Sequence, residues 1–125
     1  WKGAFKNILK KCIKFMIKKG SKNQNISAVI GPSIFRENYE VKRDFMKKFL
    51  NLNSRNRKFF YFKKTKIFFD LKEFIKSQLR SLKIRHIDII NKDTFKNRSE
   101  FFSARRALKK KEDDNGRNIS IIMLK

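Results

Sequence analysis

The sequence has 125 residues and a formal net charge of +23, so it is one domain or part of one, and it is strongly basic. A single cysteine excludes an intramolecular disulfide, and no apolar run approaches the roughly 20 residues of a membrane-spanning helix. The chain has one Cys and one His, and these two side chains cannot make a zinc site alone.

Residues 4–19 are predicted to form an amphipathic helix. Apolar side chains recur at spacings of three and four, lysines lie largely off that stripe, and Gly20 can end the helix in a left-handed conformation. We expect the stripe to face the core; the alternative is a basic helix lying on a membrane surface. The stripe consists of Phe5, Ile8, Leu9, Cys12, Ile13 and Met16.

The next elements are a short strand and a second helix. Residues 26–30 are apolar and β-branched, which predicts a buried strand ended by Gly31-Pro32. Residues 41–50 predict a helix with Val41, Phe45 and Phe49 on one side. The polar residues 51–58 predict an exposed loop.

The second half of the chain predicts further alternation of strands and helices. We expect strands at residues 59–62 and 86–90, and between them a helix capped by Asp70 that runs to about Leu82. Residues 109–116 predict a charged turn. Residues 118–124 predict a final strand, buried because both of its faces are apolar. This order predicts a layered α/β or α+β domain.

Two groups of residues are candidate binding elements. The Gly31-Pro32 turn directly follows a predicted strand, and binding loops commonly lie at such an edge. Arg105, Arg106 and Arg117 bracket a polar loop, and adjacent arginines can hold a phosphate or carboxylate. The alternative is that one arginine pairs with a nearby acid and the other is solvated.

The charge admits a second interpretation. Such a surplus attracts polyanions, and a basic nucleic-acid-binding module is one alternative function. However, the lysines are scattered along every segment and accompany abundant Ile, Asn and Phe, the mixture that AT-biased coding produces. We therefore expect weak, salt-sensitive polyanion binding and no specific nucleic-acid partner.

Several motifs occur in a defined order along the whole chain. They are Trp1-Lys2-Gly3, Gly31-Pro32-Ser33-Ile34, Tyr39-Glu40-Val41, Asp70-Leu71, Phe101-Phe102-Ser103-Ala104-Arg105-Arg106 and Gly116-Arg117. In order and spacing the chain resembles the YfiH-type laccase-domain family, known as multi-copper polyphenol oxidases and as purine nucleoside phosphorylases. The resemblance departs at Asp93, Ala104 and Ala107, where the family has Cys, Tyr and an acid.

The resemblance implies an α+β domain with α/β/β/α layers, and a zinc-dependent enzyme. Its implied reaction is phosphorolysis of adenosine, inosine, guanosine and methylthioadenosine, with adenosine deamination as a side activity; copper-dependent phenol oxidation is the older interpretation. The zinc ligands, two His and one Cys, are expected upstream of Trp1. The chain is thus expected to be the carboxy-terminal part of a single domain, to bind no metal and to be inactive alone.

The resemblance also implies a substrate-binding set, for purine nucleoside and phosphate. Arg105 is the first candidate for the phosphate, with Arg106 and Arg117 behind it. The full set is Trp1, Gly31, Pro32, Ser33, Ser103, Arg105, Arg106 and Arg117. We expect a cytoplasmic protein with no membrane partner. A non-catalytic remnant remains an alternative.

Overall fold

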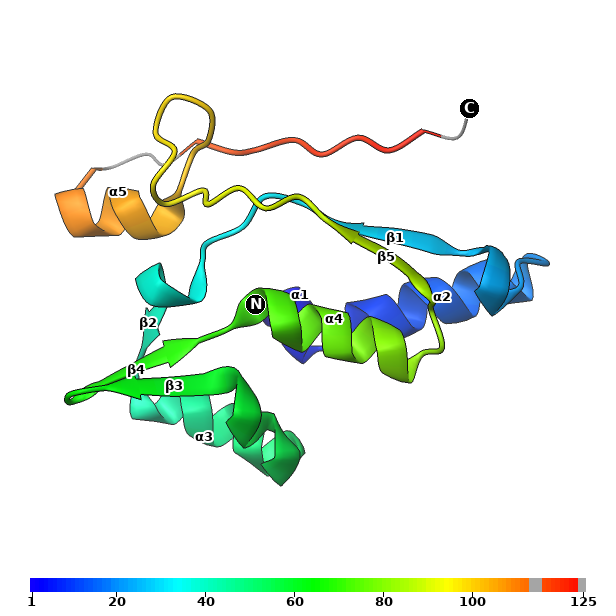
Figure 1. The fold of residues 1–125 in the computed structure, drawn as a ribbon, viewed down its shortest axis with the longest axis horizontal. Coiled ribbons are helices and arrows are strands. Elements are labelled where there is room, and N and C mark those ends of the chain that lie inside the picture. Colours follow the sequence, from blue (N-terminus) through cyan, green and yellow to red (C-terminus); the bar gives the residue numbers. More distant parts are fainter. Residues whose placement is uncertain (113–115, 124–125) are drawn as a thin grey trace.

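The chain alternates short helices and strands from its first residues to α5 (Figure 1). The computed structural model describes residues 1–112 and 116–123. Its α-helices are α1 (Lys2–Phe5), α2 (Ile8–Lys18), α3 (Arg43–Leu52), α4 (Leu71–Ser81) and α5 (Ala104–Lys110). Its strands are β1 (Ser27–Ile30), β2 (Glu40–Val41), β3 (Phe60–Lys63), β4 (Lys66–Phe69) and β5 (His86–Ile89). Short 3-10 helices lie at Asn23–Asn25, Arg36–Asn38 and Ser54–Phe59.

The strands form two separate sheets. β1 and β5 pair in parallel, with Ser27 opposite His86. β2, β4 and β3 form an antiparallel sheet in that order, with Glu40 opposite Phe68 and Phe60 opposite Phe69. Parallel and antiparallel sheets beside amphipathic helices confirm the predicted α+β class.

Aromatic side chains fill the first of two cores. Phe49 of α3 and Phe69 of β4 are fully buried, with ring centroids 4.9 Å apart. Phe45 lies one helical turn before Phe49 and stacks on it at 4.8 Å, as the i, i+4 spacing predicts. This core holds the antiparallel sheet against α3 and α4.

Aliphatic side chains fill the second core, between α2, α4 and the parallel sheet. Ile13, Ile30 and Leu79 are buried there. The helix α4 serves both cores, because Phe74 packs in the first and Leu79 in the second. The predicted cap of α4 is confirmed, since the backbone N–H of Glu73 donates to the Asp70 carboxylate at 3.0 Å.

The first predicted helix is wrong in two respects. It is divided into α1 and α2 by Asn7, whose φ of 55° is left-handed, a conformation that Asn tolerates better than most residues. Cys12 was expected in the core but is exposed. Of the α2 residues only Ile13 is buried, and Leu9 is partly buried against the same core.

Three further predictions need correction. Strand β4 was not predicted, and residues 54–59 form a 3-10 helix rather than a plain loop. Lys109 and Lys110 belong to α5 instead of a turn, while residues 113–115 lie outside the described range. Residues 118–123 form no strand and their apolar side chains are exposed; Leu124 lies outside the described residues. The expected burial of this segment is therefore wrong within the described part.

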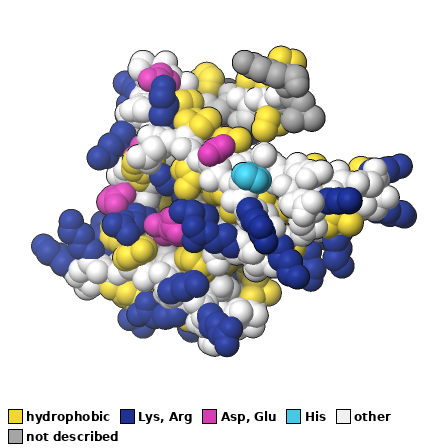
Figure 2. Space-filling view, turned by 45° about the vertical axis from the view of Figure 1, so that its right-hand side comes forward, with side chains coloured by type: hydrophobic (Ala, Val, Ile, Leu, Met, Phe, Trp, Pro, Cys, Tyr) yellow, Lys and Arg dark blue, Asp and Glu magenta, His cyan; other side chains and the backbone are white. Residues whose placement is uncertain are grey.

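The basic side chains are distributed over the surface rather than gathered in one patch on the face shown in Figure 2. Lys and Arg side chains spread over the face shown in Figure 2, with more of them over its lower half, where Figure 1 places α3 and β3. No helix within residues 1–112 and 116–123 has the length and apolar character needed to cross a membrane.

Candidate functional site

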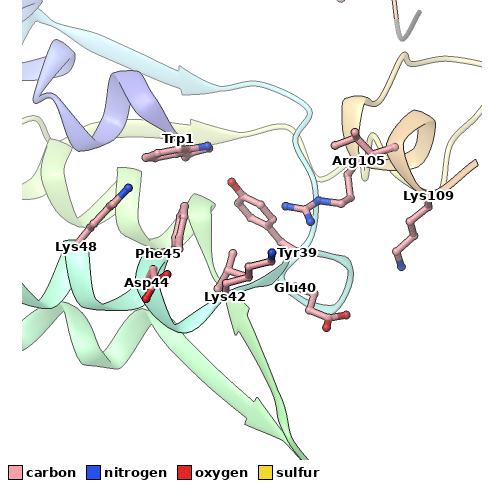
Figure 3. Close-up of a pocket in the computed structure, with 11 residues that line it drawn as sticks. Trp1, Tyr39, Glu40, Lys42, Asp44, Phe45, Lys48, Arg105 and Lys109 are labelled. Atoms are coloured by element: carbon pink, nitrogen blue, oxygen red, sulfur yellow. The ribbon is translucent and has the colours of Figure 1, made fainter. Parts of the chain in front are cut away.

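A pocket of about 530 Å³ opens between the start of the chain, β2, α3 and α5 (Figure 3). Its walls therefore come from segments that are far apart in the sequence. The lining residues are Trp1, Tyr39, Glu40, Val41, Lys42, Asp44, Phe45, Lys48, Arg105, Leu108 and Lys109.

One wall of this pocket is aromatic. The rings of Trp1 and Phe45 meet edge to face at 5.0 Å, and Tyr39 meets Phe45 at 6.2 Å. Phe45 is held by its stacking on Phe49, so the aromatic core positions this wall. Aromatic faces of this kind suit a planar aromatic ring such as a nucleobase.

The other feature of the pocket is positive charge. The Arg105 guanidinium lies 5.4 Å from the centroid of the Tyr39 ring. Figure 3 shows it between Tyr39 and α5, while the carboxylates of Glu40 and Asp44 point away from the space between Trp1 and Arg105. Four cationic side chains and two acids line the pocket, and the cations are Lys42, Lys48, Arg105 and Lys109. One of the acids, Glu40, is already paired with Lys66 at 3.1 Å. This arrangement suits an anion.

Tyr39 joins the two features. It is buried, and burial raises the pKa of its hydroxyl above the ordinary value, while the Arg105 guanidinium opposes part of that rise. The hydroxyl therefore stays protonated at neutral pH and can donate a hydrogen bond. In Figure 3 it points toward Trp1, into the pocket.

The raised pKa of Tyr39 predicts a pH dependence of stability. Between the ordinary tyrosine pKa of about 10 and the raised value, the unfolded chain loses this proton while the folded chain keeps it, so the free energy of unfolding falls as pH rises. We expect Tyr39→Phe to remove this contribution, which is at most about 1.4 kcal/mol per pH unit. Urea unfolding from about pH 8 to 11 measures it, and equal slopes in both proteins contradict the prediction.

The structure brings only part of the predicted substrate-binding set together. Trp1 and Arg105 share the pocket. Pro32 and Arg117 line a separate pocket of about 280 Å³, which also contains Phe101. The Arg117 guanidinium donates to the carbonyl of Gly116 at 2.7 Å.

The remaining residues of the predicted substrate-binding set do not line this pocket. Ser103 caps α5 by accepting from the N–H of Arg106 at 3.4 Å. The Arg106 guanidinium donates to backbone carbonyls rather than lining the pocket. Gly31 and Ser33 lie in the turn after β1, where Ser33 bridges to Asp93. Substrate contacts by these residues stay predictions.

Sequence reasoning missed several lining residues. Tyr39 was noticed only as part of a motif, and Phe45 only as a core residue. Lys48 was not singled out, although it lies one helical turn after Asp44 and could have been placed beside it. Lys109 was assigned to a turn, so its position on α5 beside Arg105 was not foreseen.

The described residues do not fit the zinc site that the resemblance implies. Within residues 1–112 and 116–123, no three His, Cys, Asp or Glu side chains lie close enough together to hold a metal ion. The single cysteine, Cys12, is on α2 and the single histidine, His86, is on β5; both are exposed. These two side chains cannot make a site of two His and one Cys.

The pocket of this α+β domain thus combines an aromatic wall with cationic side chains. The chain belongs to the family described as multi-copper polyphenol oxidoreductase laccase, whose family model matches residues 1–125. This confirms the resemblance drawn from the motifs.

Two curated relatives match the whole chain. It is 35% identical over 127 residues to a purine nucleoside phosphorylase of Rickettsia prowazekii (strain Madrid E), and 34% identical over 127 residues to one of Rickettsia conorii (strain ATCC VR-613 / Malish 7). Each alignment covers 100% of this chain and 52% of the relative. The chain thus spans about half the length of these relatives.

Proposed function

We propose that this chain is part of a purine nucleoside phosphorylase and supplies the base- and phosphate-binding walls of its pocket. The observation that carries the proposal is the position of the Arg105 guanidinium over Tyr39, in one pocket with Trp1. The names of the two relatives support the same activity. The substrates would be a purine nucleoside, such as adenosine, inosine, guanosine or methylthioadenosine, and phosphate.

The described side chains have distinct roles in this proposal. In phosphorolysis a phosphate oxygen bonds to C1′ of the sugar, the bond from C1′ to the purine nitrogen breaks, and the base takes that electron pair and a proton. Trp1 and Phe45 would hold the base by ring contacts. Arg105 would bind and orient the phosphate through two parallel hydrogen bonds, which holds the attacking oxygen near C1′.

Zinc, adenosine deamination and a cytoplasmic location complete the proposal for the whole protein. Zinc would supply a Lewis acid. Because no group of three ligand-type side chains among the described residues could hold it, no step above uses it. Copper and phenol oxidation remain the older interpretation of the same family.

The test is an assay of the full-length protein with inosine, with and without inorganic phosphate. We expect hypoxanthine and ribose 1-phosphate to form only when phosphate is present, as measured by liquid chromatography. Hypoxanthine release that is independent of phosphate contradicts phosphorolysis. No release from any of the four nucleosides would favour a non-catalytic remnant.

A further inference from the structure

Tyr39 and Arg105 stand on two walls of the pocket, and the distance between these walls depends on contacts that join their segments of the chain. Tyr39 follows the 3-10 helix Arg36–Asn38, whereas Arg105 lies on α5, more than sixty residues later. Residues 93–95 lie between these two segments and contact both. They begin at the bridge between Ser33 and Asp93, where the N–H of Thr94 donates to the carbonyl of Ser33 at 3.2 Å.

Asp93 joins this turn to the Tyr39 segment. The residue is 5% exposed, and its carboxylate accepts from the backbone N–H of Phe35 at 3.3 Å and of Phe95 at 2.8 Å. Its second oxygen accepts from Asn38 Nδ2 at 2.6 Å. Phe35 directly precedes the 3-10 helix, and Asn38 is its last residue, next to Tyr39. A buried carboxylate requires such partners, so the three bonds fix the approach of the chain to Tyr39.

Arg106 joins the same turn to α5. Its Nη1 donates to the carbonyl of Thr94 at 2.9 Å and to that of Phe95 at 3.0 Å, and its Nη2 donates to the carbonyl of Phe101. Consecutive residues of a helix point about 100° apart. With Arg106 directed at the turn, Arg105 is directed at the pocket.

We infer that Asp93 and Arg106 are positioning residues, which together set the gap between Tyr39 and Arg105 through residues 93–95. Neither lines the pocket, so each acts through its neighbour. The inference rests on the proposed function, because the gap matters only if the pocket binds substrate. It also gives a role to Asp93, which stands where the resemblance has a cysteine.

The experiment is a double-mutant cycle in the full-length protein, with inosine and inorganic phosphate as substrates. Asp93→Ala removes all three acceptor contacts, and we expect kcat/KM to fall about tenfold. In an Arg105→Ala background the same change should cost less than about twofold, because the residue being positioned is gone. Asp93→Asn should recover most of the activity, since its carbonyl can still accept from both backbone amides.

A second variant guards against a folding failure of Asp93→Ala. Asn38→Ala removes one donor to Asp93, and we expect about a threefold loss that again disappears in the Arg105→Ala background. Losses that multiply in the double variants would overturn the inference and leave the proposed function standing, as would an unchanged rate for both Asp93→Ala and Asn38→Ala. An unchanged rate for Arg105→Ala would instead overturn the proposed site, and this inference with it.

Discussion

Replacement of Arg105 by alanine in the full-length protein is expected to lower kcat/KM for inosine phosphorolysis about 10- to 100-fold. A hydrogen bond to a charged group contributes about 1.5–3 kcal/mol, and each 1.4 kcal/mol corresponds to a factor of ten in rate. The guanidinium lies in the pocket beside Tyr39 and can meet a phosphate with two parallel N–H groups. Initial rates at varied phosphate concentration measure the effect.

Two further variants separate the causes of that loss. Arg105→Lys keeps the positive charge but not the two-pronged geometry, so an intermediate rate is expected. Arg80→Ala is the matched control, because Arg80 is exposed on α4 and does not line the pocket. Its rate should equal that of the unaltered protein. An Arg105→Ala rate equal to the control would remove Arg105 from the mechanism.

The helices that pack on a core could be predicted from spacing alone. Phe45 and Phe49 on α3 and the Asp70 cap of α4 follow rules that act within one or two turns. Strand β4 was missed because its signal is weak. Only four residues pair, the first of them is Lys66 at the end of the polar run 63–66, and the Asp70 cap comes directly after them.

The last segment shows the limit of periodicity. Ile119 and Ile121 alternate as a strand would, yet they are 85% and 83% exposed. A strand requires a neighbour that completes its hydrogen bonds, and none of the strands in the described residues supplies one here. Apolar alternation indicates that a segment can form a strand, whereas the formation of that strand depends on a pairing partner elsewhere in the structure.

Two residues of the site could be predicted from the sequence, but their proximity could not. Trp1 and Arg105 were both singled out, but a separation of about a hundred residues gives no distance between them. Arg105 was ranked ahead of Arg106 as the phosphate ligand, but nothing in the spacing of the sequence separates these two neighbours. Which neighbour faces the pocket depends on the rotation of α5, and that rotation is fixed by the contacts of Arg106 with the carbonyls of Thr94 and Phe95.

Replacement of Phe49 by alanine is expected to lower the free energy of unfolding by about 3–5 kcal/mol. The side chain is fully buried, and its ring lies within 6.0 Å of the rings of five other phenylalanines. Truncation removes apolar burial and leaves a cavity between α3 and the antiparallel sheet. Urea unfolding of the full-length protein, followed by circular dichroism, measures the change. The phenylalanines in contact are Phe5, Phe45, Phe60, Phe69 and Phe74.

Phe15→Ala provides the matched control on the same residue type. Phe15 lies on α2 and is 61% exposed, so its replacement should change the free energy of unfolding by no more than about 0.5 kcal/mol. A loss below about 1 kcal/mol for Phe49→Ala would show that the aromatic core is not what stabilises the sheet. Phe49 also stacks on Phe45, which lines the pocket. The same variant should therefore bind inosine more weakly when it is assayed without urea, in its folded state. Stability and substrate binding would then depend on one stack of rings, whose buried end supports the core and whose open end lines the pocket.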